Sequence, residues 1–235
     1  YALGIIASNF YDNPSSKLKL VGVTGTNGKT TTVTLLYHLF KFLGYKTGLI
    51  STVKNYIDVV EYHATHTTPD AVQLNELLAK MVESGVSYCF MEVSSHSVVQ
   101  HRITGLNFTG GAFTNITHDH LDYHGTFENY IAAKKGFFDQ LTAQAFAISN
   151  RDDRHFAVML QNTKAIKKTC AINQQADFKA KIIENHFAGL QLHLDGTEVW
   201  TKLIGSFNAY NIFMVYSIAM MLKQDRTNVL TAISS

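Results

Sequence analysis

The sequence predicts an α/β protein with a mostly parallel sheet flanked by helices, and with a small antiparallel sheet appended near the C-terminus. Three observations support this fold class. Short apolar, β-branched runs alternate with stretches of helical apolar spacing as far as residue 150, a pattern typical of βαβ units. A glycine-rich loop joins the first such run to the first helical stretch. Beyond residue 165, short alternating stretches separated by turns favour antiparallel strands.

The composition is that of an ordinary globular protein. The chain has 235 residues, of which 46% are hydrophobic, and a formal net charge of only +2. So weak a positive charge gives no reason to expect a nucleic-acid partner. No apolar run reaches the length of a membrane span and no basic leader opens the sequence, so we expect a cytoplasmic protein. Because there is no initiator Met, we also expect an excised piece of a longer protein.

The two cysteines fit the same expectation. Cys89 and Cys170 each lie in an apolar run, which favours buried, reduced thiols over a disulfide.

The loop after the first expected strand carries the strongest functional signal. The strand covers residues 18–23, and a helix over residues 32–43 follows, ended by Gly44. The loop residues are Gly25, Thr26, Asn27, Gly28, Lys29, Thr30 and Thr31. Small residues let backbone N–H groups close around phosphate oxygens, and the helix N-terminus adds partial positive charge. We expect Lys29, as a surface charge, to reach the β- and γ-phosphates and the Thr30 hydroxyl to bind Mg²⁺.

The spacing of this loop departs from the usual phosphate-loop motif. The motif has a glycine five residues before Gly28, where this chain has Val23, and the glycines stand instead at 22, 25 and 28. The alternative is a glycine-rich turn beside an ordinary lysine. The strand–loop–helix context favours a nucleoside triphosphate site and a sheet of the phosphate-loop type.

The other elements follow in order. Residues 1–17 predict a helix end and a turn at Asn13–Ser16, and a polar passage ends in Thr67-Thr68-Pro69-Asp70. Pro69 at a first helical position and Asp70 in the first turn start a helix that Gly85 ends. Further strands are expected over residues 46–53, 87–93, 110–116 and 145–150. Short antiparallel strands are expected over residues 165–172, 178–184, 189–194 and 198–203, before a long apolar helix from Gly205 to Leu222.

Glu92 lies at the end of the expected strand over residues 87–93. Ligands of parallel α/β sheets sit at the carboxyl edge, so this carboxylate is placed to hold Mg²⁺ directly or through water. A solvated strand end is the alternative. The residues Ser94-Ser95-His96 then open a short helix that carries Gln100 and Arg102.

The densest polar cluster follows the strand over residues 110–116. Its His118-Asp119-His120-Leu121-Asp122 stretch resembles the H-x-H-x-D-H signature of metallo-β-lactamase-type hydrolases, but Tyr123 replaces the last histidine and His124 comes one place late. A hydrolase would also leave the glycine-rich loop and Glu92 unexplained. We favour His120 as ligand of a second cation that stabilises a transferring phosphoryl group, whereas His118 and His124 can equally cap a loop.

Together these motifs resemble the Mur ligases, most closely the MurE type. The segments that carry the resemblance are Gly22–Thr31, Thr67–Asp70, Met91–His96 with Gln100 and Arg102, Thr114–Gly125, Tyr130–Lys134 and Gly205–Asn211. Six segments in this order at matching spacing are highly specific. The resemblance implies that residues 18–235 form a central ATP-binding domain and residues 1–17 the junction to an N-terminal domain. It also implies that this chain contains neither that domain nor the C-terminal one.

The resemblance implies an ATP-dependent amide ligase of peptidoglycan precursor synthesis. Such an enzyme adds diaminopimelate or lysine to UDP-MurNAc-L-Ala-D-Glu through an acyl phosphate, and we expect a monomer. A folylpolyglutamate-synthase-like ligase and a non-catalytic nucleotide-binding module are the alternatives.

Matching positions imply the roles of the site residues. The loop from Gly25 to Thr31 and Asn208 bind ATP, while Thr30, Glu92 and His120 hold Mg²⁺. Lys134 matches a lysine that CO₂ carbamylates, which gives an anion able to position Mg²⁺, and Lys135 does not share this role. The contacts to the UDP-linked substrate are implied for Thr67, Thr68, Ser94, Gln100 and Arg102.

Overall fold

The structure is a computed structural model that describes residues 1–64, 66–119 and 121–234. The strands are β1 Lys19–Thr24, β2 Thr47–Ile50, β3 Lys54–Ile57, β4 Val60–His63, β5 Tyr88–Glu92, β6 Gly110–Phe113, β7 Phe146–Asn150, β8 Ile166–Ala171, β9 Phe178–His186, β10 Gly189–Leu194 and β11 Thr197–Thr201. The helices are α1 Ala2–Phe10, the 3₁₀ turn η1 Pro14–Ser16, α2 Lys29–Phe42, α3 Ala71–Glu83, α4 Ser95–Val99, α5 Leu121–His124, α6 Phe127–Asp139, α7 Phe156–Leu160, α8 Ser206–Met221 and α9 Arg226–Ser234.

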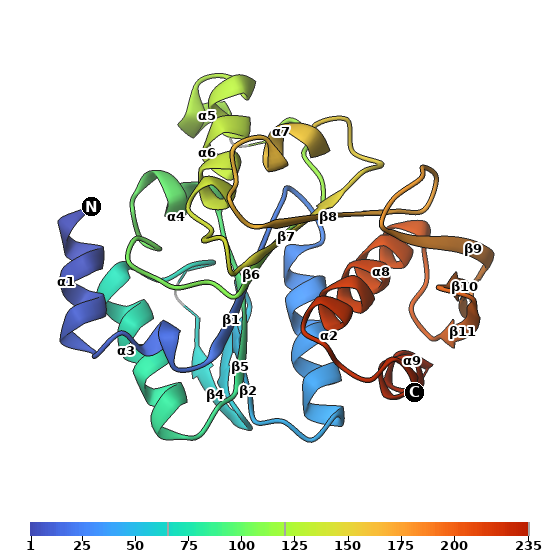
Figure 1. The fold of residues 1–235 in the computed structure, drawn as a ribbon, viewed down its shortest axis with the longest axis horizontal. Coiled ribbons are helices and arrows are strands. Elements are labelled where there is room, and N and C mark those ends of the chain that lie inside the picture. The colour runs from blue at the N-terminus through green and yellow to red at the C-terminus, as the bar shows by residue number, and fades with distance from the viewer. Residues whose placement is uncertain (65, 120, 235) are drawn as a thin grey trace.

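One continuous sheet runs through the molecule, in the order β11-β10-β9-β8-β7-β6-β1-β5-β2-β3-β4. The strands from β9 to β2 in this order pair in parallel, and the pairs at both ends are antiparallel. Helices cover both faces: α2 and α8 lie on one, and α1, α3 and α4 lie on the other (Figure 1). The expected α/β fold class is therefore confirmed.

Each face of the sheet has its own hydrophobic core. Side chains alternate across β1, so Val21 and Val23 pack with α2 and α8 while Leu20 packs on the α3 side. On that second face a Cβ added to Gly22 would lie 2.6 Å from the Phe137 ring of α6. Only glycine lets the helix pack this closely on the central strand.

The appended sheet differs from the prediction at its first strand. The stretch expected over residues 165–172 is β8, which pairs in parallel with β7 from Phe146↔Ile166 to Asn150↔Cys170. The crossover through α7 returns the chain to the same end of the sheet, as a parallel pair requires. Only β9, β10 and β11 form the antiparallel part. The polar passage after residue 53 also contains a hairpin, β3–β4, that the sequence pattern did not predict.

Helix boundaries differ from the prediction at two places. Asp70 does not lie in the first turn of α3 but caps it, because its Oδ1 accepts from the N–H groups of Val72 at 2.9 Å and Gln73 at 3.0 Å. Pro69 therefore precedes the helix. The short helix α4 ends at Val99, so Gln100 is its C-cap and Arg102 lies beyond it, and neither is carried on the helix.

Cys89 and Cys170 are free and buried, as expected, and burial raises the pKa of both thiols. Among the helices that the structure describes, we find none with the length and apolar character to cross a bilayer.

Candidate nucleotide and metal site

The glycine-rich loop lies at the carboxyl edge of the parallel strands, between β1 and α2. Gly28 caps α2 with φ +84°, and a Cβ there would stand 2.3 Å from Asn211 Oδ1 of α8. Both its backbone conformation and this close contact therefore require glycine. This contact also brings two of the family motifs together, the segment Gly205–Asn211 and the segment Gly22–Thr31.

The end of β6 fixes the loop by a set of hydrogen bonds. Asn115 Oδ1 accepts from the Asn27 N–H at 3.0 Å, and the Asn115 carbonyl accepts from the Thr26 N–H at 2.8 Å. The Thr114 hydroxyl donates to the Asn27 carbonyl at 2.7 Å. We did not single out Thr114 and Asn115 as site residues, although their place at a strand end beside the loop was a usable signal.

Lys29 is not the surface charge that the sequence suggested. Its side chain is half-buried, and its Nζ donates to the carbonyls of Gly25 at 3.0 Å and Thr26 at 2.9 Å. Burial lowers the pKa of Lys29, while the negative charges of Glu92 and Asp119 oppose this shift. The amine thus lies inside the curve of the loop, where it can move from carbonyl oxygens to phosphate oxygens.

Thr30 and Glu92 meet as expected for two groups that share a cation. The Thr30 hydroxyl donates to Glu92 Oε1 at 2.8 Å, and Glu92 is 1% exposed. Thr52 also donates to Oε1, from its N–H at 2.8 Å and its hydroxyl at 3.1 Å. In the described chain every hydrogen bond to this carboxylate ends on Oε1, which leaves Oε2 for another partner. A hydroxyl and a carboxylate are the hard oxygen ligands that suit Mg²⁺, so the residues fit this ion.

Thr52 is a residue that the sequence analysis missed. Its signal was its place at the end of the second parallel strand, which brings it to the same edge as Glu92.

Lys134 lies in the site and Lys135 does not. Lys134 is 1% exposed, its Nζ donates to the Gly25 carbonyl at 2.8 Å and lies 4.5 Å from the centre of the Tyr130 ring. Burial and then the charge of Lys29 lower its pKa well below the ordinary value, against a smaller opposing effect of Asp119. Lys135 instead pairs with Asp139 at 2.6 Å, one turn along the same helix.

The histidine cluster is described only in part. His120 lies outside the described residues, so its role as a metal ligand stays a prediction. His118 is exposed and stacks on Phe127 with ring centres 4.3 Å apart, while His124 is buried with Nε2 2.9 Å from the Ser95 hydroxyl. Both contacts are compatible with loop-stabilising roles for these two histidines.

The five residues predicted to contact the UDP-linked substrate lie close together. The Thr68 hydroxyl donates to the Glu92 carbonyl at 2.9 Å and lies 3.5 Å from the Ser94 hydroxyl. Arg102 donates to the Thr68 carbonyl at 2.7 Å and to Gln100 Oε1 at 2.9 and 2.6 Å. Thr67 accepts a hydrogen bond from Thr52 at 3.1 Å. This set is therefore continuous with the candidate metal site.

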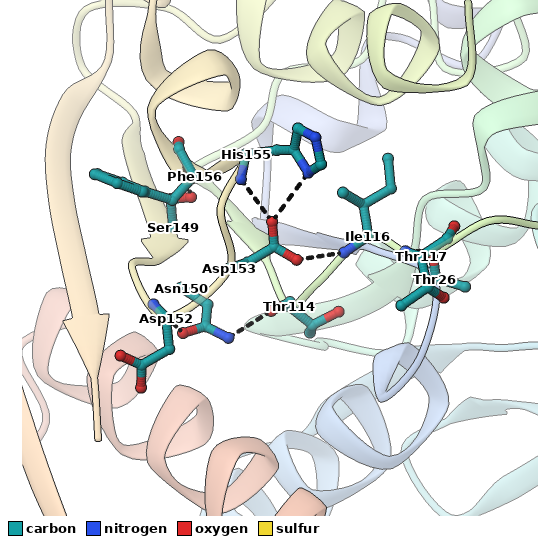
Figure 2. A network of polar contacts seen from close by, with 10 residues as sticks. All are labelled: Thr26, Thr114, Ile116, Thr117, Ser149, Asn150, Asp152, Asp153, His155 and Phe156. Atoms are coloured by element: carbon teal, nitrogen blue, oxygen red, sulfur yellow. Dashed lines mark hydrogen bonds and ion pairs between the residues drawn. The ribbon is translucent and has the colours of Figure 1, made fainter. Parts of the chain in front are cut away.

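A cavity of about 560 Å³ opens beside the loop and reaches α8. Asn208 does not line it, because its amide donates to the Ile204 carbonyl at 2.8 Å and its Oδ1 accepts from Asn211 at 3.1 Å. The neighbouring Asn211 does line it. Three more polar residues that we did not predict also line it, Asn150 at the end of β7 and Asp152 and Asp153 just after it (Figure 2).

The fold and this site define an α/β nucleotide-binding domain of the phosphate-loop class. Residues 23–219 match the family model described as the Mur ligase middle domain. The chain belongs to the Mur ligase family, as its middle domain.

The curated relatives that the chain matches include two ligases of the same name. The chain is 61% identical over 234 residues to the UDP-N-acetylmuramoyl-L-alanyl-D-glutamate–2,6-diaminopimelate ligase of Cytophaga hutchinsonii, and 56% identical to the ligase of the same name from Parabacteroides distasonis. Each match covers 100% of this chain and 48% of the relative. The chain thus spans about half the length of the curated relatives it matches.

Solved structures show the same fold. A structure of a ligase with that name superposes with a TM-score of 0.82 at 28% identity, over 92% of this chain and 46% of the other. MurF from Acinetobacter baumannii superposes with a TM-score of 0.79 at 19% identity, over 100% of this chain and 49% of the other, which supports the fold alone.

Proposed function

We propose that this chain is the ATP- and Mg²⁺-binding part of a ligase that joins 2,6-diaminopimelate to UDP-MurNAc-L-Ala-D-Glu. The observation that carries the proposal is the Thr30–Glu92 contact of 2.8 Å beside a phosphate loop, in a chain of the Mur ligase family. The choice of diaminopimelate over lysine is supported by the names of the curated relatives.

In this proposal the chain's own residues organise a phosphoryl transfer. Backbone N–H groups of Gly25–Thr31 and the Lys29 amine bind the ATP phosphates, and Thr30 and Glu92 hold Mg²⁺, with His120 serving a second ion. When bound, Mg²⁺ neutralises charge on the transferring phosphoryl group. A substrate carboxylate attacks the γ-phosphorus and ADP leaves. The incoming amine then displaces phosphate from the acyl phosphate, which gives the amide.

We propose that Lys134 is carbamylated in the active enzyme. A buried amine with a lowered pKa is neutral more often, and a neutral amine adds to CO₂ with loss of one proton. The product keeps an N–H at Nζ, so the 2.8 Å hydrogen bond to the Gly25 carbonyl can persist. That bond would orient the new carboxylate group away from the loop carbonyl and toward the cation site.

In the proposed substrate site, Arg102 binds an anionic group of the UDP-linked substrate. No carboxylate of the described residues lies within ion-pair distance of its guanidinium, which Gln100 and the Thr68 carbonyl hold in place. A fixed guanidinium without an anionic partner suits a carboxylate or phosphate of the substrate. Thr67 and Ser94 border the same surface.

The remaining parts of the proposal concern the whole protein. We propose that residues 1–17 join an N-terminal domain, that residues 18–235 form the central domain, and that the amino acid is recognised outside this chain. A cytoplasmic monomer is proposed, since ATP and a UDP-linked precursor are the substrates. Gel filtration of the full-length protein tests the monomer.

The deciding experiment is a ligation assay with the full-length parent, ATP, Mg²⁺ and UDP-MurNAc-L-Ala-D-Glu. We expect ADP, phosphate and the amide to form with diaminopimelate and far more slowly with lysine. Faster reaction with lysine would contradict the choice of amino acid. Product with folate or with no UDP-linked acceptor would favour a folylpolyglutamate-synthase-like ligase, and nucleotide binding without any turnover would favour a non-catalytic module.

A further inference from the structure

The turn after β7 is bonded to the segment that follows β6. Asp153 lies in this turn with a side chain that is 9% exposed. Its Oδ2 accepts from the Ile116 N–H at 2.8 Å, and its Oδ1 accepts from the His155 N–H at 2.8 Å (Figure 2). Among the described residues no lysine or arginine pairs with this carboxylate, and His155 Nδ1 lies 3.5 Å from Oδ1. Backbone N–H groups are therefore its main partners.

The residue after Ile116 bonds to the phosphate loop in both directions. The Thr117 N–H donates to Thr26 Oγ1 at 3.0 Å, and this hydroxyl lies 3.3 Å from the Thr117 carbonyl, to which it donates. Asp119, two residues further on, is near enough to Lys29 and Lys134 to influence both amines. The segment of residues 116–119 is thus held by Asp153 on one side and faces the loop and its lysines on the other.

We propose that Asp153 is a positioning residue for phosphoryl transfer, which fixes residues 116–119 against the phosphate loop. The inference rests on the proposed function. Asp153 touches neither substrate nor nucleotide phosphates in this role and acts through the Ile116 amide and Thr117. A carboxylate suits the position because both of its oxygens accept a backbone N–H. Asparagine has only one acceptor oxygen. Its NH₂ group would face the N–H of either Ile116 or His155, and two donors cannot form a hydrogen bond with each other.

The first test is Asp153→Asn in the full-length enzyme. We expect kcat to fall by about tenfold or more, because small displacements of reacting groups are costly, while KM for the UDP-linked substrate stays within about twofold. Amide exchange of the peptide that contains Ile116 should become faster, with the melting temperature close to that of the wild type. This local readout would not follow from a general loss of stability.

The matched control is Asp177→Asn. Asp177 also accepts a backbone N–H, from Thr169 at 2.8 Å, and pairs with Lys168, but none of its partners is in the phosphate loop or in residues 114–119. We expect kcat and the exchange of the Ile116 peptide to stay at wild-type values in this variant.

A double-mutant cycle with Thr26→Val tests whether Asp153 acts on the phosphate loop through Thr117 and Thr26. If Asp153 acts through Thr117 and Thr26, the two losses in kcat share a cause and the double variant loses less than their product. Losses that multiply would overturn the route. If Asp153→Asn does not fold, Asp153→Glu carries the same criteria, because it keeps both acceptor oxygens and displaces them by one methylene.

The outcomes separate the two levels of inference. Wild-type enzyme without ATP-dependent ligation would refute the proposed function. Active wild type, with Asp153→Asn equal to Asp177→Asn in kcat or unchanged in Ile116 exchange, would refute the role of Asp153 alone.

Discussion

The carbonyl oxygen of Gly25 accepts hydrogen bonds from two lysines, Lys29 at 3.0 Å and Lys134 at 2.8 Å. The two lysines are 105 residues apart in sequence, on α2 and α6, and their amines meet at the loop between β1 and α2. Burial lowers the pKa of each, and the charge of Lys29 lowers that of Lys134 further. At the residue scale, the site is therefore a place where protonation is costly and an arriving anion is favoured.

Lys29→Ala is expected to abolish measurable ATP binding by this chain and leave it folded. The substitution removes two hydrogen bonds to loop carbonyls but also removes a partly buried charge, so we expect a stability change of about 1 kcal/mol. Titration calorimetry measures the affinity, and urea unfolding measures the stability. Equal ATP affinity in the wild type and the variant would refute the phosphate-loop interpretation.

Lys134→Ala in the full-length parent is expected to reduce ligation by about 10²–10³-fold, because the proposed carbamate acts on charge that develops during the reaction. A short carboxylic acid added to the assay should restore part of the activity. Lys135→Ala is the matched control, since Lys135 pairs with Asp139 and should affect activity little.

A crystal structure of the full-length enzyme with nucleotide, Mg²⁺ and bicarbonate gives the direct test of this modification. An unmodified Lys134 beside two well-occupied metal sites would contradict it.

At the scale of elements, the sequence pattern identified the central strands β1, β5, β6 and β7 because each is an apolar run bounded by turn residues. It failed where pairing depends on distant partners. Nothing local distinguishes β8, a parallel strand of the main sheet, from the antiparallel strands after it, since its direction follows from α7 and from pairing with β7. The hairpin β3–β4 was missed because its strands have only four residues each and the second is exposed throughout, so burial leaves little pattern in the sequence.

The cap of α3 gives a testable prediction at this scale. Asp70→Ala removes a side chain that accepts two N–H groups of the first turn, and we expect a loss of about 1 kcal/mol in the free energy of unfolding. Glu83→Ala, at the other end of the same helix, is the control and should be neutral or slightly stabilising. Urea unfolding at neutral pH compares the two. Equal effects would show that the cap contributes nothing.

At the scale of the whole molecule, family motifs located the loop, Glu92 and Lys134, but not the residues that hold them in place. Thr52 and Asp153 have short polar side chains in unremarkable local sequence, and Asn115 lies in a motif that does not reveal its contact with the loop. All three make their contacts because parallel strands bring their ends to one edge. Asn208 stays a predicted nucleotide contact: its side chain bonds to Ile204 and Asn211, and of these two asparagines it is Asn211 that lines the cavity.

Stability of the chain should depend on pH through Lys134. Its pKa in the folded state lies below the ordinary value of 10.5, so between these two values the unfolded chain binds more protons. Stability therefore rises with pH across this window, at most by about 1.4 kcal/mol per pH unit for one group. Lys134→Met should flatten the rise, as measured by urea unfolding from about pH 7 to 9.5. Parallel curves for the wild type and the variant would contradict the burial argument.

The way in which the loop holds Lys29 has a consequence for affinity. Its amine already faces two peptide carbonyls, those of Gly25 and Thr26, and little bulk water. A phosphate that binds here replaces these carbonyls as the acceptor of the amine's hydrogen bonds. It does not have to remove a full hydration shell from the side chain or restrict a freely rotating one. Part of the dehydration and of the loss of rotamer freedom has thus occurred during folding, and we expect this preorganisation to strengthen the proposed binding of triphosphate.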